Sequence, residues 1–221
     1  MKLTDNLHAF LWQSMTANNC NTYLIDGPSR VLIDPGHRAQ FDHVRQGLAQ
    51  LELGIDDIDL VICTHAHPDH LESVPLFKNT PARFTLHATE WQWAATIGKQ
   101  MSAAYGINMD DFRPDFFLQE GTLALNGIEL DVIHTPGHSP GSVTLYWPGQ
   151  KALFTGDLIF KEGVGRTDLP GGDGSLLKQS IQGLKDLDAA WLLSGHGDVI
   201  AGAANVKKNF ADVESFYFAY V

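Results

Sequence analysis

The 221-residue sequence contains few cysteines and no long apolar run. Its two cysteines, Cys20 and Cys63, lie in apolar, strand-like stretches, so we expect buried thiols rather than a disulfide. No apolar segment approaches the roughly 18 residues that span a bilayer, and the first residues lack the pattern of a secretory signal. We therefore exclude a disulfide-rich scaffold and a membrane partner, and we expect a cytoplasmic protein.

Clusters of basic residues are also missing. The formal net charge is −11, and Lys207-Lys208, the only adjacent basic pair, lies in a predicted helix where a solvated face is the simplest interpretation. A nucleic-acid-binding protein normally presents a basic face. We expect a small-molecule substrate and no nucleic-acid partner.

The composition is that of an ordinary globular protein, with 44% hydrophobic and 19% charged residues. The sequence has no low-complexity stretch and no linker rich in proline or serine. A chain of this length can bury most of its apolar surface in one core. We therefore expect a single domain over residues 1–221.

Apolar periodicity predicts alternating strands and helices. Phe41, Val44, Leu48 and Leu51 recur at helical spacing. The predicted helices cover 39–52, a short segment from 70, 174–186 and 203–218. The predicted strands cover 7–13, 20–26, 30–34, 58–63, 82–87, 122–125, 128–134, 142–147, 151–155 and 190–193.

The segment Thr64-His-Ala-His-Pro-Asp-His70 places three imidazoles and a carboxylate directly after the predicted strand 58–63. Imidazole nitrogen and carboxylate oxygen are ligands that suit zinc and other transition metals, whereas calcium and magnesium prefer oxygen alone. Four ligands so close together indicate two adjacent ions. The simpler alternative is a solvated loop in which Asp69 caps a helix.

Three later strands also end in loops that offer ligands. His138 lies in a Gly- and Pro-rich loop after strand 128–134, Asp157 follows strand 151–155, and His196 follows strand 190–193. The recurrence of a strand followed by a ligand-bearing loop favours the metal site over the solvated loop.

This ordered ligand set resembles that of the metallo-β-lactamase superfamily, and Val164-Gly-Arg-Thr-Asp-Leu-Pro-Gly-Gly172 resembles a loop of its glyoxalase II-like branch. The resemblance implies an α+β fold, the four-layer αββα sandwich. It assigns His65, His67 and His138 to one divalent ion and Asp69, His70 and His196 to a second, with Asp157 bridging. Zinc is the expected metal, and iron or manganese are alternatives, because the same ligands bind all three.

The resemblance implies a metal-dependent hydrolase of thioesters such as S-(2-hydroxyacyl)glutathione. We expect a metal-bridging hydroxide as the nucleophile, with Asp69 as a catalytic residue that orients it or returns a proton. Only about 25 residues follow His196, whereas glyoxalase II has a longer helical C-terminal region that supplies glutathione contacts. The alternatives are a mononuclear-iron persulfide dioxygenase, a lactone or phosphodiester hydrolase, and a non-enzymatic, metal-stabilised binding protein.

Two further features leave alternatives open. Arg166 could clamp a substrate carboxylate or form a salt bridge with Asp168 that shapes its loop. The aromatic-rich segment 88–117, which we expect to be helical, could be a substrate lid, a contact in a homodimer, or ordinary core packing.

Overall fold

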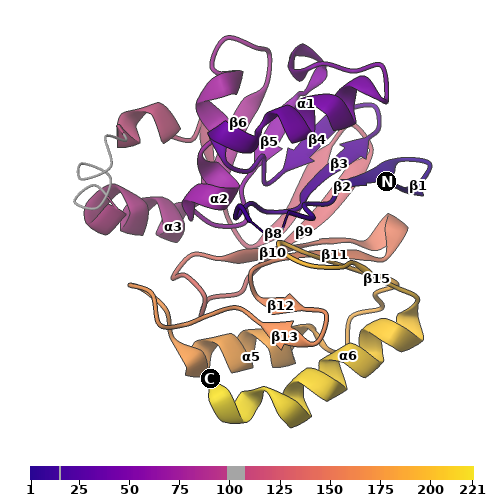
Figure 1. Ribbon diagram of the computed structural model, residues 1–221, viewed down its shortest axis with the longest axis vertical. Coiled ribbons are helices and arrows are strands. Elements are labelled where there is room, and N and C mark those ends of the chain that lie inside the picture. Colours follow the sequence, from indigo (N-terminus) through magenta and orange to yellow (C-terminus); the bar gives the residue numbers. More distant parts are fainter. Residues whose placement is uncertain (15, 99–107) are drawn as a thin grey trace. The chain divides into compact units, whose positions relative to one another are not determined.

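The computed structural model describes residues 1–14, 16–98 and 108–221. The chain divides into two compact units, Met1–Leu118 and Gln119–Val221. Each unit contains one large sheet, with helices packed on it (Figure 1). No helix within the described residues combines the length and apolarity needed to cross a bilayer. The expectation of one domain stays a prediction.

In the first unit, the sheet follows chain order, with antiparallel pairing from β1 to β4 and parallel pairing from β4 to β7. Parallel neighbours end at the same edge of a sheet, so the loops after β4, β5 and β6 lie together. The strands are β1 Lys2–Thr4, β2 Leu7–Phe10, β3 Thr22–Asp26, β4 Arg30–Ile33, β5 Leu60–Ile62, β6 Arg83–His87 and β7 Phe116–Leu118. The helices are α1 Asp42–Ala49, α2 Pro68–Leu71 and α3 Ala88–Trp93, with single turns at Arg38–Gln40, Ile55–Asp57, Val74–Phe77, Ala94–Gly98 and Met109–Phe112.

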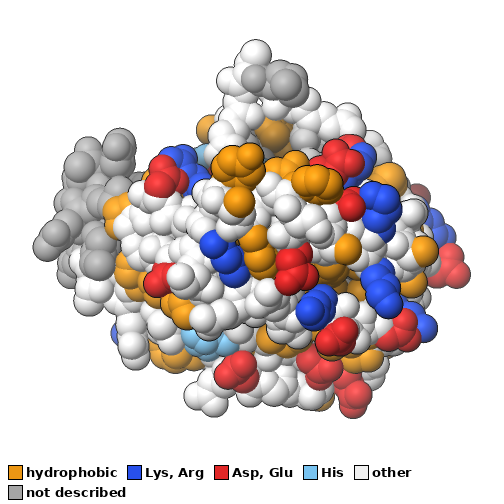
Figure 2. All heavy atoms as spheres, turned by 90° about the horizontal axis from the view of Figure 1, so that it is seen from below, with side chains coloured by type: hydrophobic (Ala, Val, Ile, Leu, Met, Phe, Trp, Pro, Cys, Tyr) orange, Lys and Arg blue, Asp and Glu red, His pale blue; other side chains and the backbone are white. Residues whose placement is uncertain are grey.

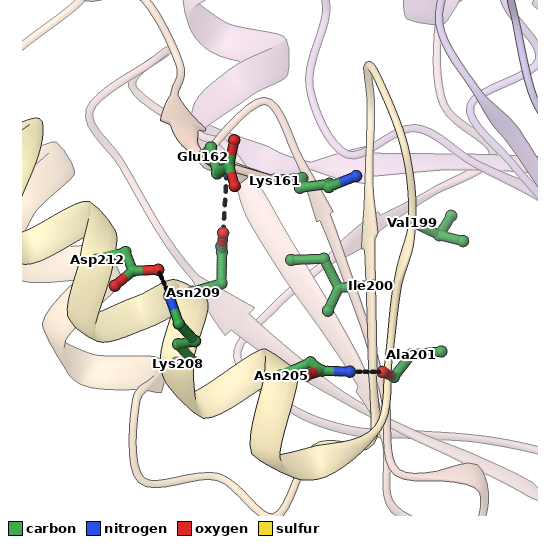
Figure 3. Close-up of a pocket in the computed structure, with 9 residues that line it drawn as sticks. All are labelled: Lys161, Glu162, Val199, Ile200, Ala201, Asn205, Lys208, Asn209 and Asp212. Carbon is green, nitrogen blue, oxygen red and sulfur yellow. Dashed lines mark hydrogen bonds and ion pairs between the residues drawn. The ribbon is translucent and has the colours of Figure 1, made fainter.

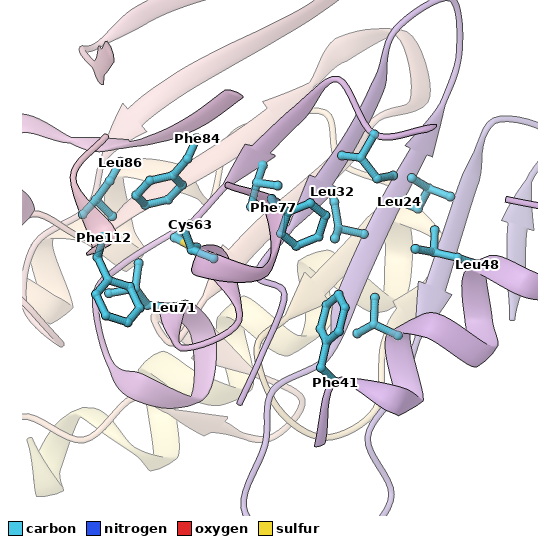
Figure 4. Packing of buried hydrophobic residues seen from close by; sticks show 14 of the residues in the cluster. Leu24, Leu32, Phe41, Leu48, Cys63, Leu71, Phe77, Phe84, Leu86 and Phe112 are labelled. Atoms are coloured by element: carbon cyan, nitrogen blue, oxygen red, sulfur yellow. The ribbon is translucent and has the colours of Figure 1, made fainter. Parts of the chain in front are cut away.

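The core of the first unit lies between α1 and its sheet. Buried Leu48 of α1 packs with Leu24 of β3 and Leu32 of β4 (Figure 4). Val44 of α1 belongs to the same buried cluster. Gly47 brings the helix close to β2, because a Cβ atom there would lie 2.5 Å from the ring of Phe10. This packing fixes the strands whose ends carry the predicted ligands.

Several elements of the first unit differ from the sequence prediction, since β1 was not predicted and the strand predicted over 7–13 ends at Phe10. The helix predicted to reach 52 ends at Ala49, because Glu52 adopts a left-handed φ of 59° and the Leu53 N–H returns to the Leu48 carbonyl. Part of 88–117 is helical, but Phe116 and Phe117 lie in β7. Met101 and Tyr105 of that segment lie outside the described residues.

In the second unit, the strand order is β15-β14-β11-β10-β9-β8, with β12 and β13 forming a separate hairpin. Strands β11 and β14 are parallel, and β9 runs in the direction of β11 because both are antiparallel to β10. The strands are β8 Gly121–Leu125, β9 Ile128–His134, β10 Val143–Trp147, β11 Ala152–Gly156, β12 Ile159–Phe160, β13 Gly163–Val164, β14 Trp191–Ser194 and β15 Ile200–Ala201. The helices are α5 Gly174–Leu184 and α6 Ala203–Phe216, with single turns at Pro148–Gln150 and Phe218–Tyr220.

Helices α5 and α6 cover one face of this second sheet (Figure 1). Leu177 and Ile181 of α5 and Phe210 of α6 pack with Leu153 of β11 and Leu192 of β14. Helix α5 begins at Gly174 because the Asp173 side chain accepts a hydrogen bond from the Leu176 N–H. On the face shown in Figure 2, acidic and basic side chains are interspersed rather than gathered by sign.

Both cysteines are free and buried, as predicted. Burial raises the pKa of the Cys63 thiol well above its ordinary value, so the reactive thiolate is disfavoured. The structure confirms the prediction of buried thiols.

We predict that His8, a buried residue of β2, makes stability depend on pH. Burial lowers the pKa of His8, and the N-terminal amine and Lys2 lower it further, while Asp26 opposes the shift. Between the ordinary pKa of about 6.5 and the lower folded value, the unfolded chain binds more protons, so acid destabilises the fold. The stability advantage of wild type over His8→Gln should therefore shrink from pH 7 to about pH 5 in urea unfolding of metal-free protein. An advantage that is constant over this range would contradict the prediction.

Candidate metal centre

In the first unit, the predicted ligands lie on the turn between β5 and α2. Pro68 occupies the first position of α2, where its missing N–H has no cost, and it ends the extended backbone of β5. His65 Nε2 and His67 Nδ1 lie 3.1 Å apart, and the rings of His65 and His70 have centroids 4.1 Å apart. Asp69 and His70 offer ligand atoms within 4.8 Å of each other. The four side chains form one cluster.

A buried carboxylate on the neighbouring strand orients this cluster. Asp34 follows β4, and its side chain accepts hydrogen bonds from the Thr64 N–H and hydroxyl, both at 2.8 Å. The Asp34 Oδ2 atom also lies 2.9 Å from His70 Nδ1. A carboxylate at Nδ1 keeps that proton on the imidazole and leaves the Nε2 lone pair for a metal.

Two further polar side chains hold the same turn. Glu90 of α3 is fully buried, and its Oε1 accepts a hydrogen bond from the Ala66 N–H at 2.9 Å, between the two histidines. Asn18 donates to Asp69 Oδ2 at 2.8 Å. The turn is therefore restrained both at its backbone and at one of its ligand side chains.

In the second unit, three loops bring the remaining predicted ligands together. Asp157 and His196 leave the parallel neighbours β11 and β14, and His138 follows β9, which ends at the same edge. Asp157 Oδ2 lies 3.5 Å from His138 Nε2 and 3.3 Å from His196 Nε2. His138 Nδ1 lies 2.8 Å from the Arg166 carbonyl oxygen, which can only accept, so Nδ1 carries the proton and Nε2 presents its lone pair.

The two Asp157 separations fit a shared metal ion better than direct hydrogen bonds, and the His65–His67 separation fits either. Donor atoms at 2.0–2.1 Å from a tetrahedral zinc lie roughly 3.3 Å from one another. The His65–His67 separation of 3.1 Å and the two Asp157 separations of 3.3 and 3.5 Å are close to that value. A direct imidazolium–carboxylate hydrogen bond would bring nitrogen and oxygen to about 2.7–2.9 Å. The mixed nitrogen and oxygen donors fit zinc, iron or manganese.

The seven predicted ligands thus form two clusters, one in each unit: His65, His67, Asp69 and His70 in the first, and His138, Asp157 and His196 in the second. The supporting residues Asn18, Asp34 and Glu90 were not among the site residues predicted from sequence. The position of Asp34 after the strand next to β5 would have revealed it once the sheet order was known. Glu90 carries no local signal within its aromatic segment.

Arg166 forms the salt bridge that the sequence analysis considered. Its guanidinium donates from Nε and Nη2 to the two Asp168 oxygens, each at 2.7 Å. This pairing holds the pKa of Asp168 at about 2. Both side chains are exposed, so Arg166 acts on His138 through its backbone carbonyl, while its role as a substrate clamp stays a prediction.

We predict that Gly165→Ala disrupts the second-unit cluster. A Cβ atom at Gly165 would lie 1.8 Å from the Asp157 carbonyl oxygen and 3.3 Å from His138 Nδ1, so the backbone beside two predicted ligands must move. Zinc affinity should fall at least tenfold, with a loss of about 1–3 kcal/mol in the unfolding free energy of metal-free protein. Chelator competition and urea unfolding measure the two effects.

Gly163→Ala, two residues earlier in β13, is the matched control. Its Cβ would lie 3.7 Å from the nearest atom, on the Phe160 ring, which is an ordinary contact. Equal effects of the two substitutions would refute the close-approach explanation.

Comparison with known proteins identifies the family. Residues 15–196 match the model of the metallo-β-lactamase superfamily. The probable metallo-hydrolase MJ0888 of Methanocaldococcus jannaschii is 34% identical over 81% of this chain and 88% of its own length. The hydroxyacylglutathione hydrolase GloC of Haemophilus influenzae is 31% identical, over 81% of this chain and 85% of its own length.

The fold comparison agrees with the sequence comparison. The crystal structure of the metallo-β-lactamase family protein TTHA1429 from Thermus thermophilus aligns with a TM-score of 0.78 at 23% identity, over 99% of this chain and 81% of that chain. This match confirms the predicted α+β fold class. The chain belongs to the metallo-β-lactamase superfamily and is a metal-dependent hydrolase of that superfamily.

Proposed function

We propose that this hydrolase cleaves thioesters, with S-(2-hydroxyacyl)glutathione as the first candidate substrate. The observation that carries the proposal is the Asp157 carboxylate, one oxygen of which faces the Nε2 atoms of both His138 and His196. That arrangement suits a bridging ligand between two ions. The similarity to GloC of H. influenzae, which is named for hydroxyacylglutathione hydrolysis, supports the thioester class.

The proposed ligand assignment is the one that the family resemblance implies. His65, His67 and His138 hold one divalent ion, Asp69, His70 and His196 hold the second, and Asp157 bridges them. The separation of 3.1 Å between His65 Nε2 and His67 Nδ1 is compatible with their sharing an ion. Zinc is the first candidate metal, with iron and manganese as alternatives.

When bound, the ions would polarise the thioester carbonyl and lower the pKa of water so that hydroxide forms near neutral pH. The protein residues fix the protonation pattern around them. Asp34 and the Arg166 carbonyl keep protons on the Nδ1 atoms of His70 and His138, so both Nε2 atoms present lone pairs. Asn18 donates to Asp69 Oδ2 and so restrains this carboxylate. The proposed role of Asp69 is to orient the nucleophile or to return a proton to the leaving thiolate.

The remaining proposals follow from the sequence. We propose a cytoplasmic location and a small-molecule substrate with no nucleic-acid or membrane partner. A homodimer through the aromatic segment stays an open alternative.

The direct test is hydrolysis of S-D-lactoylglutathione by protein of known zinc, iron and manganese content. We expect a metal-dependent kcat/KM above about 10⁴ M⁻¹s⁻¹. Asp157→Ala should lower turnover by orders of magnitude, whereas a purely structural metal would affect chiefly folding stability. Absence of turnover by fully metallated protein would eliminate this substrate, and oxygen consumption with glutathione persulfide would then test the dioxygenase alternative.

A pair of substitutions tests whether Arg166 binds substrate. If its guanidinium clamps a substrate carboxylate, Arg166→Ala should raise KM about tenfold or more with little change in kcat, because charge-assisted bidentate bonds are lost. Asp168→Ala frees the same guanidinium from its ion pair. This substitution should lower KM or leave it unchanged. If the two residues only shape the loop, both substitutions will change the kinetics equally, and the clamp is dismissed.

A further inference from the structure

The β12–β13 hairpin contacts or adjoins all three predicted ligands of the second unit. It begins two residues after Asp157. The Phe160 ring stands edge-on to His196, with centroids 6.0 Å apart and an interplanar angle of 77°. Just beyond the hairpin, the Arg166 carbonyl accepts the hydrogen bond from His138. The position of this hairpin therefore determines where the ligand side chains point.

The hairpin is too short to hold its own shape. Only two residue pairs, Ile159 with Val164 and Phe160 with Gly163, join its strands. Its turn contains Glu162 in a left-handed conformation at φ 55°, which a non-glycine residue adopts at a cost. Isolated two-stranded hairpins are marginally stable at best. An anchor outside the hairpin is required.

Asn209 of α6 provides that anchor. It lies on the apolar face of the helix, three residues after Val206 and four before Val213, and is only 5% exposed. Its Oδ1 accepts a hydrogen bond from the Glu162 N–H, and its Nδ2 donates to the Phe160 carbonyl, each at 2.9 Å. Figure 3 shows Asn209 reaching from α6 to Glu162. One carboxamide thus joins the end of β12 to the turn.

The base of the hairpin is held by its own packing, since Ile159 is fully buried in the core of this unit and its carbonyl accepts a hydrogen bond from the Thr155 hydroxyl at 3.0 Å. A second side-chain link at the turn is weaker than the one from Asn209. Lys161 forms an ion pair with Asp198 at 2.8 Å, but both side chains are largely exposed. Exposed ion pairs are screened by solvent and contribute little stability. Of these two links at the turn, the buried carboxamide of Asn209 is the stronger restraint.

We propose that Asn209 is a positioning residue for the metal centre. Its carboxamide fixes the hairpin, and the hairpin orients His196 through the Phe160 ring and His138 through the Arg166 carbonyl. Asn209 itself contacts none of the predicted ligands. The inference rests on the proposed assignment of His138, Asp157 and His196 as metal ligands.

The first test compares Asn209→Leu with Asn205→Leu. Asn205 lies one turn earlier on α6, in the same groove, but its side chain donates to the Ala201 carbonyl and does not touch the hairpin (Figure 3). Competition with a chromogenic chelator measures zinc affinity, and the visible absorption of bound Co²⁺ reports ligand geometry. Asn209→Leu should weaken zinc binding by about tenfold to a hundredfold and change the cobalt spectrum. Asn205→Leu should match wild type in both measurements.

A double-mutant cycle with Phe160→Leu tests whether Asn209 acts on the metal centre through the hairpin. If Asn209 acts through the hairpin, the losses in zinc affinity from Asn209→Leu and Phe160→Leu should not add. Additive losses would show that Asn209 acts by another path and would overturn the inference. Wild-type zinc affinity and cobalt spectrum in Asn209→Leu would overturn it as well.

Two controls distinguish a loss of metal affinity from a loss of folding and from a failure of the proposed thioester activity. Circular dichroism and urea unfolding of the metal-free variants establish that each is folded. If Asn209→Leu does not fold, Asn209→Asp carries the test, because it keeps the acceptor for Glu162 and loses the donor to Phe160. Its zinc affinity should fall about tenfold, and wild-type affinity would refute the proposal. None of these measurements uses a substrate, so a failed thioester assay leaves them intact.

Discussion

Buried negative charge is the constraint on which the turn after β5 depends. Asp34 and Glu90 are almost fully inaccessible to solvent, and an uncompensated buried carboxylate costs several kcal/mol. Asp34 is compensated by Thr64 and His70, and Glu90 by the Ala66 N–H. These donors belong to the ligand-bearing turn itself. The hydrogen bonds that compensate the buried carboxylates therefore also hold the imidazoles in place. The side chains that accept these bonds come from β4 and α3, so the sheet order of the first unit is what makes the turn rigid.

The second unit restrains its ligands mainly through backbone atoms. The Arg166 carbonyl sets the proton on His138, and the absence of a side chain at Gly165 lets its backbone pass against the Asp157 carbonyl. Asn209 likewise bonds to main-chain groups of the hairpin rather than to side chains. Side-chain substitutions on this loop would therefore matter less than changes that move its backbone. Arg166 is an example: its exposed side chain pairs with Asp168, while its backbone carbonyl accepts the hydrogen bond from His138.

The sequence predicted the secondary structure well wherever apolar periodicity was sufficient. Strand 128–134 matches β9, and helix 174–186 was predicted two residues too long. The end of α1 was missed because Leu51 continues the apolar spacing beyond the left-handed turn. Strand β7 was missed because its pairing partner, β6, is remote in sequence. The predicted ligands stood out by residue type and spacing, whereas Asp34, Glu90 and Asn209 became visible only with tertiary structure, because each acts on a segment far away in the chain.

The groove beside Asn209 has a pharmacological consequence. It is an open groove of about 390 Å³ that is lined by polar as well as apolar side chains, among them Lys161, Glu162, Ile200 and Asn209. A compound seated there would compete with Asn209 for the main-chain groups of the hairpin. Under the proposed route, such a compound would inhibit by loosening the metal centre, without chelating the metal or mimicking the substrate.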